Sequence, residues 1–189
     1  MVGARMFGRG LAAFAAGAAL SFVASRLMPP LAGRAIGAVR AAAGGDPFDA
    51  LARDHQRVLG MIDTLLQADD GATMRRTATL LQIKRALTAH AFAEEDVVYP
   101  LLHDQADAAQ AADRLYREHA DLKLHLFRLE QLPKDDPRWR DELGALRDLI
   151  ARHARDEEEI EFPRLRAALS PDATARLSSE VAREKQLVL

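Results

Sequence analysis

The chain has 189 residues, about the size of one domain and enough to bury a hydrophobic core. It contains no cysteine, which excludes disulfides, iron–sulfur clusters, thiolate zinc sites and cysteine nucleophiles, so any chemistry must come from His, Asp, Glu or hydroxyl groups. The formal net charge is −2, and a chain without a basic excess is a poor candidate for binding nucleic acid.

The first 45 residues form a basic arm that differs from the rest of the chain. They carry five arginines, no acidic residue and 8 of the 11 glycines, whereas residues 46–189 carry 21 basic and 28 acidic side chains. Residues 10–25, between Arg9 and Arg26, are uncharged. As a helix they would be about 24 Å long, against a hydrocarbon core of about 30 Å. Three interpretations stay open: membrane association through residues 10–25, a secretory signal peptide without a clear cleavage site, and a soluble arm. We expect a cytoplasmic protein, attached to the inner membrane under the first interpretation.

From Asp46 onward the apolar residues recur at helical spacing, and no alternation typical of strands is present. The expected helices span about 47–69, 72–102, 107–132, 137–169 and 170–185, with Pro47, Pro137 and Pro171 as start signals. We expect Pro100 to kink or end the second of them. The predicted inward-facing residues include Leu51, Val58, Ile62, Leu80, Ile83, Leu87, Val97, Leu101, Leu115, Leu122, Leu126, Leu143, Leu146, Ile150 and Ile160.

Four long amphipathic helices with short loops predict an all-α fold, an up-down-up-down four-helix bundle. We therefore divide the chain into the apolar and basic arm at 1–45, the bundle at 46–169 and a short C-terminal helix with its tail at 170–189.

The second half of the bundle repeats the first. HAFAEEDVVYP at 90–100 matches HARDEEEIEFP at 153–163: His, two glutamates four and five residues later, an aromatic residue and Pro. Upstream, the pair Asp54-His55 matches Glu118-His119. The sequence therefore predicts two copies of a helical hairpin that face each other.

Polar residues lie in the middle of each predicted apolar stripe. His55, His90, His119 and His153 fall one per helix, and Glu94 and Glu157 follow two of them by one turn. Two buried carboxylates cost several kcal/mol each unless positive charge compensates them. Metal ions are the economical compensation, because imidazole and carboxylate at i and i+4 are neighbours on a helix face.

Six nitrogen and oxygen ligands favour iron, or less strongly manganese, and suit two metals bridged by two carboxylates. His103 and His125 fall outside this face and are predicted to lie on the surface. We expect Glu95, Glu158 and Glu159 to be solvated or to support the ligands from behind.

The set His55, His90 with Glu94, His119, and His153 with Glu157 resembles the hemerythrin-like HHE cation-binding domain, over about residues 46–169. The resemblance implies a non-haem di-iron centre in a four-helix bundle. It further implies that His55 and His90 serve one iron and His119 and His153 the other, with the two glutamates bridging.

Two departures separate this chain from oxygen-carrying hemerythrins. Those proteins have a second histidine four residues after the third-helix histidine, where this chain has Lys123, and an Asp five residues after the fourth-helix histidine, where it has Glu158. A missing ligand leaves room for water or an oxygen species, which favours reactive or sensing chemistry over reversible carriage.

We therefore expect a bacterial-type di-iron protein that binds or responds to O2, NO, peroxide or iron. The alternatives are an enzyme that decomposes peroxide or NO, an iron store or scavenger, and a metal-free helical scaffold. The sequence shows no dedicated general acid, so enzymatic activity stays open. The expected partners are a diatomic or peroxide ligand and a membrane at residues 10–25, with no nucleic acid.

Overall fold

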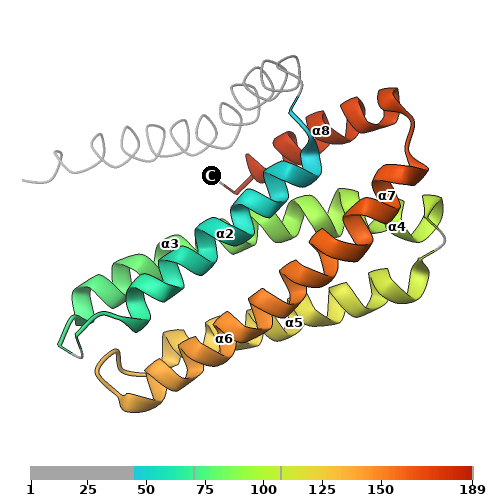
Figure 1. Cartoon of the computed structure of the whole chain (residues 1–189). Coiled ribbons are helices and arrows are strands. Elements are labelled where there is room, and N and C mark those ends of the chain that lie inside the picture. Colours follow the sequence, from blue (N-terminus) through green and yellow to red (C-terminus); the bar gives the residue numbers. More distant parts are fainter. Residues whose placement is uncertain (1–44, 70, 107, 189) are drawn as a thin grey trace, which may run out of the picture.

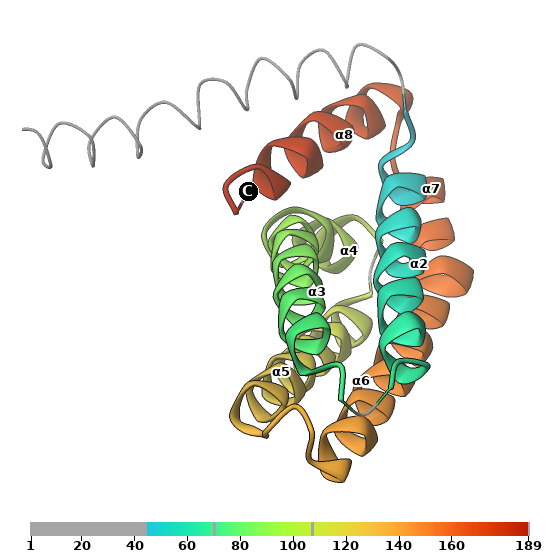
Figure 2. The ribbon, with the colours of Figure 1, turned by 90° about the vertical axis from the view of Figure 1, so that its left-hand side faces the viewer.

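The computed structural model describes residues 45–69, 71–106 and 108–188, and within them the chain is helical without any strand. Four rods form a bundle in which each runs antiparallel to its neighbours (Figures 1 and 2). Two are single helices, α2 (Pro47–Leu66) and α5 (Ala109–Gln131). The other two are each built from three segments, α3 (Thr73–Ala93) with η1 (Glu94–Val98) and α4 (Tyr99–Gln105), and α6 (Pro137–Asp156) with η2 (Glu157–Glu161) and α7 (Phe162–Ala168). The all-α bundle predicted from the sequence is thus the observed fold.

Three helices begin at an acidic or hydroxyl cap followed by proline, as the sequence predicts. The Asp46 carboxylate accepts a hydrogen bond of 2.8 Å from the backbone N–H of Phe48 at the start of α2. Asp136 caps α6 in the same way. Ser170 caps α8 (Pro171–Lys185), which lies across the α4 and α7 end of the bundle (Figure 2). The cap satisfies backbone donors that have no partner inside the helix, and proline at the next position needs none.

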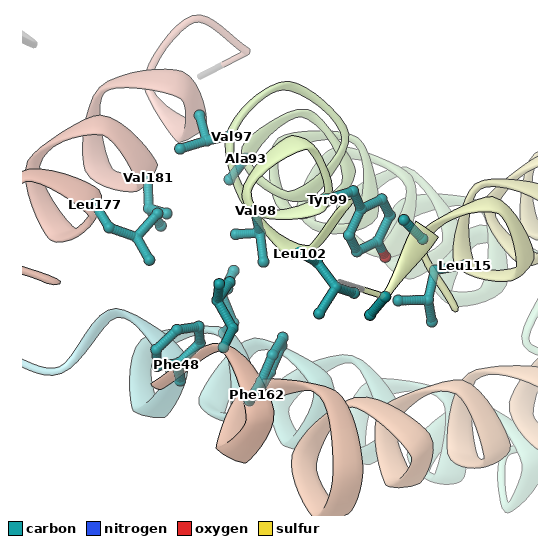
Figure 3. Close-up of a cluster of buried hydrophobic side chains, with 14 of the residues drawn as sticks. Phe48, Ala93, Val97, Val98, Tyr99, Leu102, Leu115, Phe162, Leu177 and Val181 are labelled. Atoms are coloured by element: carbon teal, nitrogen blue, oxygen red, sulfur yellow. The ribbon is translucent and has the colours of Figure 1, made fainter. Parts of the chain in front are cut away.

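The core is divided into two apolar clusters. The upper cluster, shown in Figure 3, contains Phe48, Val98, Leu102 and Phe162 and is covered by Leu177 and Val181 of α8. The lower cluster surrounds Trp139 and contains leucines and isoleucines of α2, α3, α5 and α6. The polar residues singled out above lie between the two clusters, since Leu51 belongs to the upper one and Val58 to the lower one, on either side of His55.

Two predicted core positions are wrong by one residue. Ile160 is 48% exposed and Glu161 is buried instead, while Leu101 is only half-buried and Leu102 is buried. Ile160 lies inside the π turn η2, and Leu101 follows the π turn η1. A π turn holds one residue more than an α turn and so moves the inward position along by one. Pro100 lies just after the first π turn, and the rod continues to Gln105 rather than ending there.

No helix of the described residues is both long and apolar enough to cross a membrane. The membrane segment considered at residues 10–25 lies outside the described residues.

Candidate metal centre

The six residues predicted to bind metal meet in one buried layer at mid-bundle. His55 comes from α2, His90 from α3, His119 from α5 and His153 from α6, and each is at most 3% exposed. Glu94 and Glu157 are fully buried. One ligating atom from each of five of the residues, all but His119, lies within 4.8 Å of the others.

The two π turns place the glutamates. Glu94 is the first residue of η1 and Glu157 the first of η2, each one turn after a histidine on the same rod. In each turn the first glutamate enters the layer and the second reaches a histidine of a neighbouring helix: Glu95 reaches His119, and Glu158 reaches His55. Single π turns inside helices are frequent at functional sites.

Each inner glutamate lies between histidines of different halves. Glu94 Oε2 is 2.9 Å from His90 Nε2 and 3.4 Å from His119 Nε2. Glu157 Oε2 is 3.4 Å from His153 Nε2 and 3.3 Å from His55 Nε2. If His55 and His90 form one ligand pair and His119 and His153 the other, each glutamate touches one member of both pairs. That is the placement a bridging carboxylate requires.

A second set of carboxylates holds the imidazole rings from behind. Each Nδ1 faces one of them: His55 with Glu158 (2.9 Å), His90 with Asp54 (3.5 Å), His119 with Glu95 (2.9 Å) and His153 with Glu118 (2.8 Å). The three contacts of 2.8 and 2.9 Å are hydrogen bonds, which fix the tautomer so that Nε2 of His55, His119 and His153 points into the layer. Asp54 makes only the longer ionic contact with His90. The expected supporting role therefore fits Glu95 and Glu158, whereas Glu159 is exposed.

Several ligating atoms are buried without a hydrogen-bond partner. They include Nε2 of His55, Oε1 of Glu94 and Oε2 of Glu157. Buried polar atoms are nearly always satisfied, so a concentration of unsatisfied nitrogen and oxygen atoms at one point calls for an additional group. A metal ion is such a group, and this donor set fits it.

The layer is strongly anionic. In the metal-free chain, protonated imidazoles compensate the charge of the carboxylates. Burial alone would lower the pKa of His90, but the carboxylates of Glu94 and Asp54 raise it to about 10. Burial likewise opposes the shift at His119, whose pKa is raised to about 9 by Glu94 and Glu95. Burial would raise the pKa of Glu94, yet His90 and His119 hold it well below its usual value. A dication can replace these protons, because metal ligands must be deprotonated.

Tyr99 adds a phenol to the layer. Its hydroxyl donates a hydrogen bond of 2.8 Å to Glu157 Oε1 and lies 3.0 Å from His119 Nε2. Burial and the charges of Glu157 and Glu94 raise the pKa of Tyr99 well above its usual value, so the phenol keeps its proton. The corresponding residue of the second half is Phe162, which has no hydroxyl.

A small cavity opens onto the four histidines from the side between α3 and α5, which contact each other less than the other neighbouring helices do. Its volume is about 60 Å³. Apart from the imidazoles and two polar side chains, the wall is apolar, formed by Leu87, Ala91, Phe92, Leu122, Leu126 and Ile150, with Thr88 and Lys123 as the polar members.

Lys123 stands where oxygen carriers would have a further histidine. Its ammonium group turns outward and donates to Glu95 at 2.7 and 3.1 Å, so it holds the carboxylate that supports His119. Lys123 therefore holds a carboxylate that supports His119.

The remaining histidines lie away from the layer, as predicted. His103 is exposed beside Asp104, and His125 is half-buried against Glu142 at 2.7 Å. His125 is therefore more enclosed than the surface position predicted for it.

Sequence reasoning did not assign Tyr99, Asp54 or Glu118 to the site. The signals were present, since the acidic residue before each first histidine and the aromatic residue before each proline belong to the repeat. These three residues could not be assigned a role, because sequence spacing alone does not show which helix a side chain reaches.

Comparison with known proteins shows the family to which the chain belongs. The Hemerythrin HHE cation binding domain model matches residues 27–165. The chain belongs to the hemerythrin HHE family. Among curated proteins, this chain is 25% identical over 142 residues to a hemerythrin-like protein of Schizosaccharomyces pombe. The match covers 74% of this chain and 69% of that protein. It is also 30% identical over 132 residues to a DNA nickase of Nostoc sp., covering 70% of this chain but only 37% of the nickase.

A solved structure shares the fold. It is the crystal structure of a hemerythrin HHE cation binding domain-containing protein from Mycobacterium kansasii, with a TM-score of 0.65 and 22% sequence identity. The match covers 76% of this HHE chain and 88% of that one. The helix α8 begins after the last residue that the family model matches.

Proposed function

We propose that the protein binds two iron ions in the layer and uses them to bind or sense a small uncharged molecule such as O2, NO or peroxide. The observation that carries the proposal is the position of Glu94 and Glu157, each of which contacts one histidine from both halves. His55 and His90 would hold one ion and His119 and His153 the other. When bound, such a metal pair supplies a redox-active centre to which a diatomic molecule can coordinate.

The chain's own residues supply the selectivity. The cavity of about 60 Å³ has room for only a few water-sized molecules, since about 10–15 Å³ of such space holds one water. Its apolar wall favours an uncharged ligand over a hydrated ion, and the two apolar clusters keep bulk water from the layer. The same volume argues against storage of many iron ions inside this bundle.

Tyr99 and the outer carboxylates hold protons and rings in place. The phenol of Tyr99 is a neutral donor within reach of a ligand in the layer, while Glu95, Glu118 and Glu158 keep Nε2 of their histidines directed inward. These residues support the binding of a ligand.

Anaerobic loading with iron, metal analysis and absorption spectra before and after O2, NO and peroxide test the proposal. We expect about two irons per chain and a new band with at least one of the three ligands. His119→Ala should lose iron, whereas the matched control His125→Ala, on the same helix but outside the layer, should keep both ions. A chain that takes up no iron, or loses none in His119→Ala, contradicts the proposal. Rapid turnover of peroxide or NO would instead favour the enzyme.

We further propose that residues 10–25 associate the protein with a membrane. Their 16 uncharged residues between Arg9 and Arg26 support this, because arginines at both ends can reach lipid head groups. Membrane fractionation of the full chain beside a chain that starts at Gly45 tests it. We expect only the full chain in the membrane fraction, and recovery of both in the soluble fraction would contradict the proposal.

The activity printed for the Nostoc relative is not part of this proposal. The chain spans 37% of that protein, and residues 46–189 carry an acidic excess that would repel nucleic acid.

A further inference from the structure

The C-terminal helix α8 packs on the rod that carries His90 and Glu94. It contacts α3 and η1 more than any other element. Leu177 and Val181 of α8 are buried in the upper cluster, beside Val97 and Val98 of η1 (Figure 3). The helix is therefore a docked part of the molecule, although it lies outside the four rods and beyond residues 27–165.

The last residue of α8 reaches the metal layer through one intermediate. Lys185 Nζ donates a hydrogen bond to Asp54 Oδ2 on α2, and both side chains are 22% exposed. The same oxygen lies 3.5 Å from Nδ1 of His90. The carboxylate of Asp54 therefore lies between the ammonium group of Lys185 and the imidazole of His90.

The internal repeat explains why a residue from so far along the chain is needed. An offset of 64 residues aligns Asp54 with Glu118, and it aligns Ala50 with Arg114. In the second half, Arg114 stands one turn before Glu118 and supplies a cation from the same helix at 3.6 Å. In the first half that position is the apolar Ala50, which cannot do so. Lys185 fills the place that the repeat leaves without a cation.

We propose that Lys185 is a positioning residue of the metal centre, which fixes Asp54 against His90 and thereby couples the docking of α8 to metal binding. The inference rests on the proposed function, because it concerns the same layer. A carboxylate behind a metal-binding histidine, as Asp54 lies behind His90, affects metal affinity by about 10- to 100-fold. Coupling is reciprocal, so bound metal should hold α8 more firmly in its turn.

The full-length, metal-free chain titrated with Co²⁺ under anaerobic conditions tests the inference, with the Co²⁺ absorption bands as the readout. We expect Lys185→Met to weaken one of two binding steps about tenfold and leave the other unchanged. Lys185→Arg should restore binding. Arg176→Met, which removes a cation from the exposed face of the same helix, is the matched control and should bind as the wild type does.

The sign of the effect separates positioning from simple electrostatics. Removing a nearby positive charge would by itself raise the affinity for a dication, whereas loss of positioning lowers it. In an Asp54→Asn chain the carboxylate is already gone, so Lys185→Met should cause no further loss.

Hydrogen exchange at residues 171–185 gives a second readout. Co²⁺ should slow exchange there in the wild type and in Arg176→Met, and much less in Lys185→Met. Equal Co²⁺ affinities and equal protection in Lys185→Met and Arg176→Met would overturn the inference while the proposed function stands. A wild-type chain that binds no Co²⁺ and no iron would contradict both.

Discussion

Tyr99 is a residue at which the two halves of the centre differ, because Phe162 takes its place in the second half. Replacing Tyr99 with Phe makes this position alike in the two halves and leaves Glu157 without the donor at 2.8 Å. We expect the metal-free chain to lose about 1–3 kcal/mol of unfolding free energy, the usual cost of removing a partner from a buried charged group. Denaturant unfolding measures this.

Tyr116 provides the control for that substitution. Its hydroxyl donates to the backbone oxygen of Glu95 at 2.6 Å but the side chain is 39% exposed, so water can replace the partner. Tyr116→Phe should change the unfolding free energy by about 0.5 kcal/mol or less. Equal losses in the two variants would mean that the phenol of Tyr99 has no special place in the layer.

Glu157 and Glu159 allow a test of the carboxylates themselves, since they lie in the same π turn with opposite exposure. Glu157→Gln should lose at least one of two irons, because an amide is a poor substitute for a bridging carboxylate. Glu159→Gln should keep both. Metal analysis after anaerobic loading decides, and full iron content in Glu157→Gln would remove the bridging assignment and favour a helical scaffold.

At the scale of the element, much of the bundle follows from sequence and one feature does not. The caps at Asp46, Asp136 and Ser170 and the apolar spacing of α2 and α5 are local signals, and the helices begin and end within a few residues of the predicted positions. The π turns have no comparable local signal. Each holds one residue more than an α turn and so displaces the inward positions in or after it, as at Ile160 and Glu161.

The candidate site shows the same division. Four histidines and two glutamates at repeated spacing in apolar stripes could be singled out because burying them costs free energy without a compensating ion. The contacts that hold the rings could not, because Asp54 reaches His90, Glu95 reaches His119 and Lys185 reaches Asp54 between different helices. Contacts of that kind depend on how the helices are rotated in the bundle, which a single sequence leaves open.

The space between α3 and α5 can be tested as the route of entry. Thr88 of α3 is half-buried in the cavity wall. Thr88→Trp should fill part of the opening and slow the association of NO several-fold at unchanged iron content, because the cavity measures only about 60 Å³. Stopped-flow absorption of the iron-loaded protein measures the rate. Gln82→Trp, on the exposed side of α3, is the control, and equal rates in the two variants would place the entry elsewhere.

At the scale of the whole molecule, the two halves form one charged unit whose stability depends on what neutralises it. In the metal-free chain, His90 and His119 have pKa values raised from 6.5 to about 10 and about 9. Because these pKa values are raised in the folded state, the two protonated histidines stabilise the fold fully below pH 6.5. This stabilisation is lost as the pH rises toward 10. Glu94 acts in the opposite direction, since its pKa is lowered from 4.5 and its contribution is present above that pH.

The metal-free chain should therefore be most stable between about pH 4.5 and 6.5, with a melting temperature several degrees lower at pH 8.5. Bound metal should reverse this pH dependence of the melting temperature, because the ions need deprotonated imidazoles and bind more tightly as the pH rises. Thermal unfolding at pH 5.5, 7.0 and 8.5 with a chelator, and again with Co²⁺ in excess, compares the two states. A metal-free chain that gains stability toward pH 8.5, or a Co²⁺ effect that does not grow with pH, would show that the imidazole protons and the metal do not compete for the same layer.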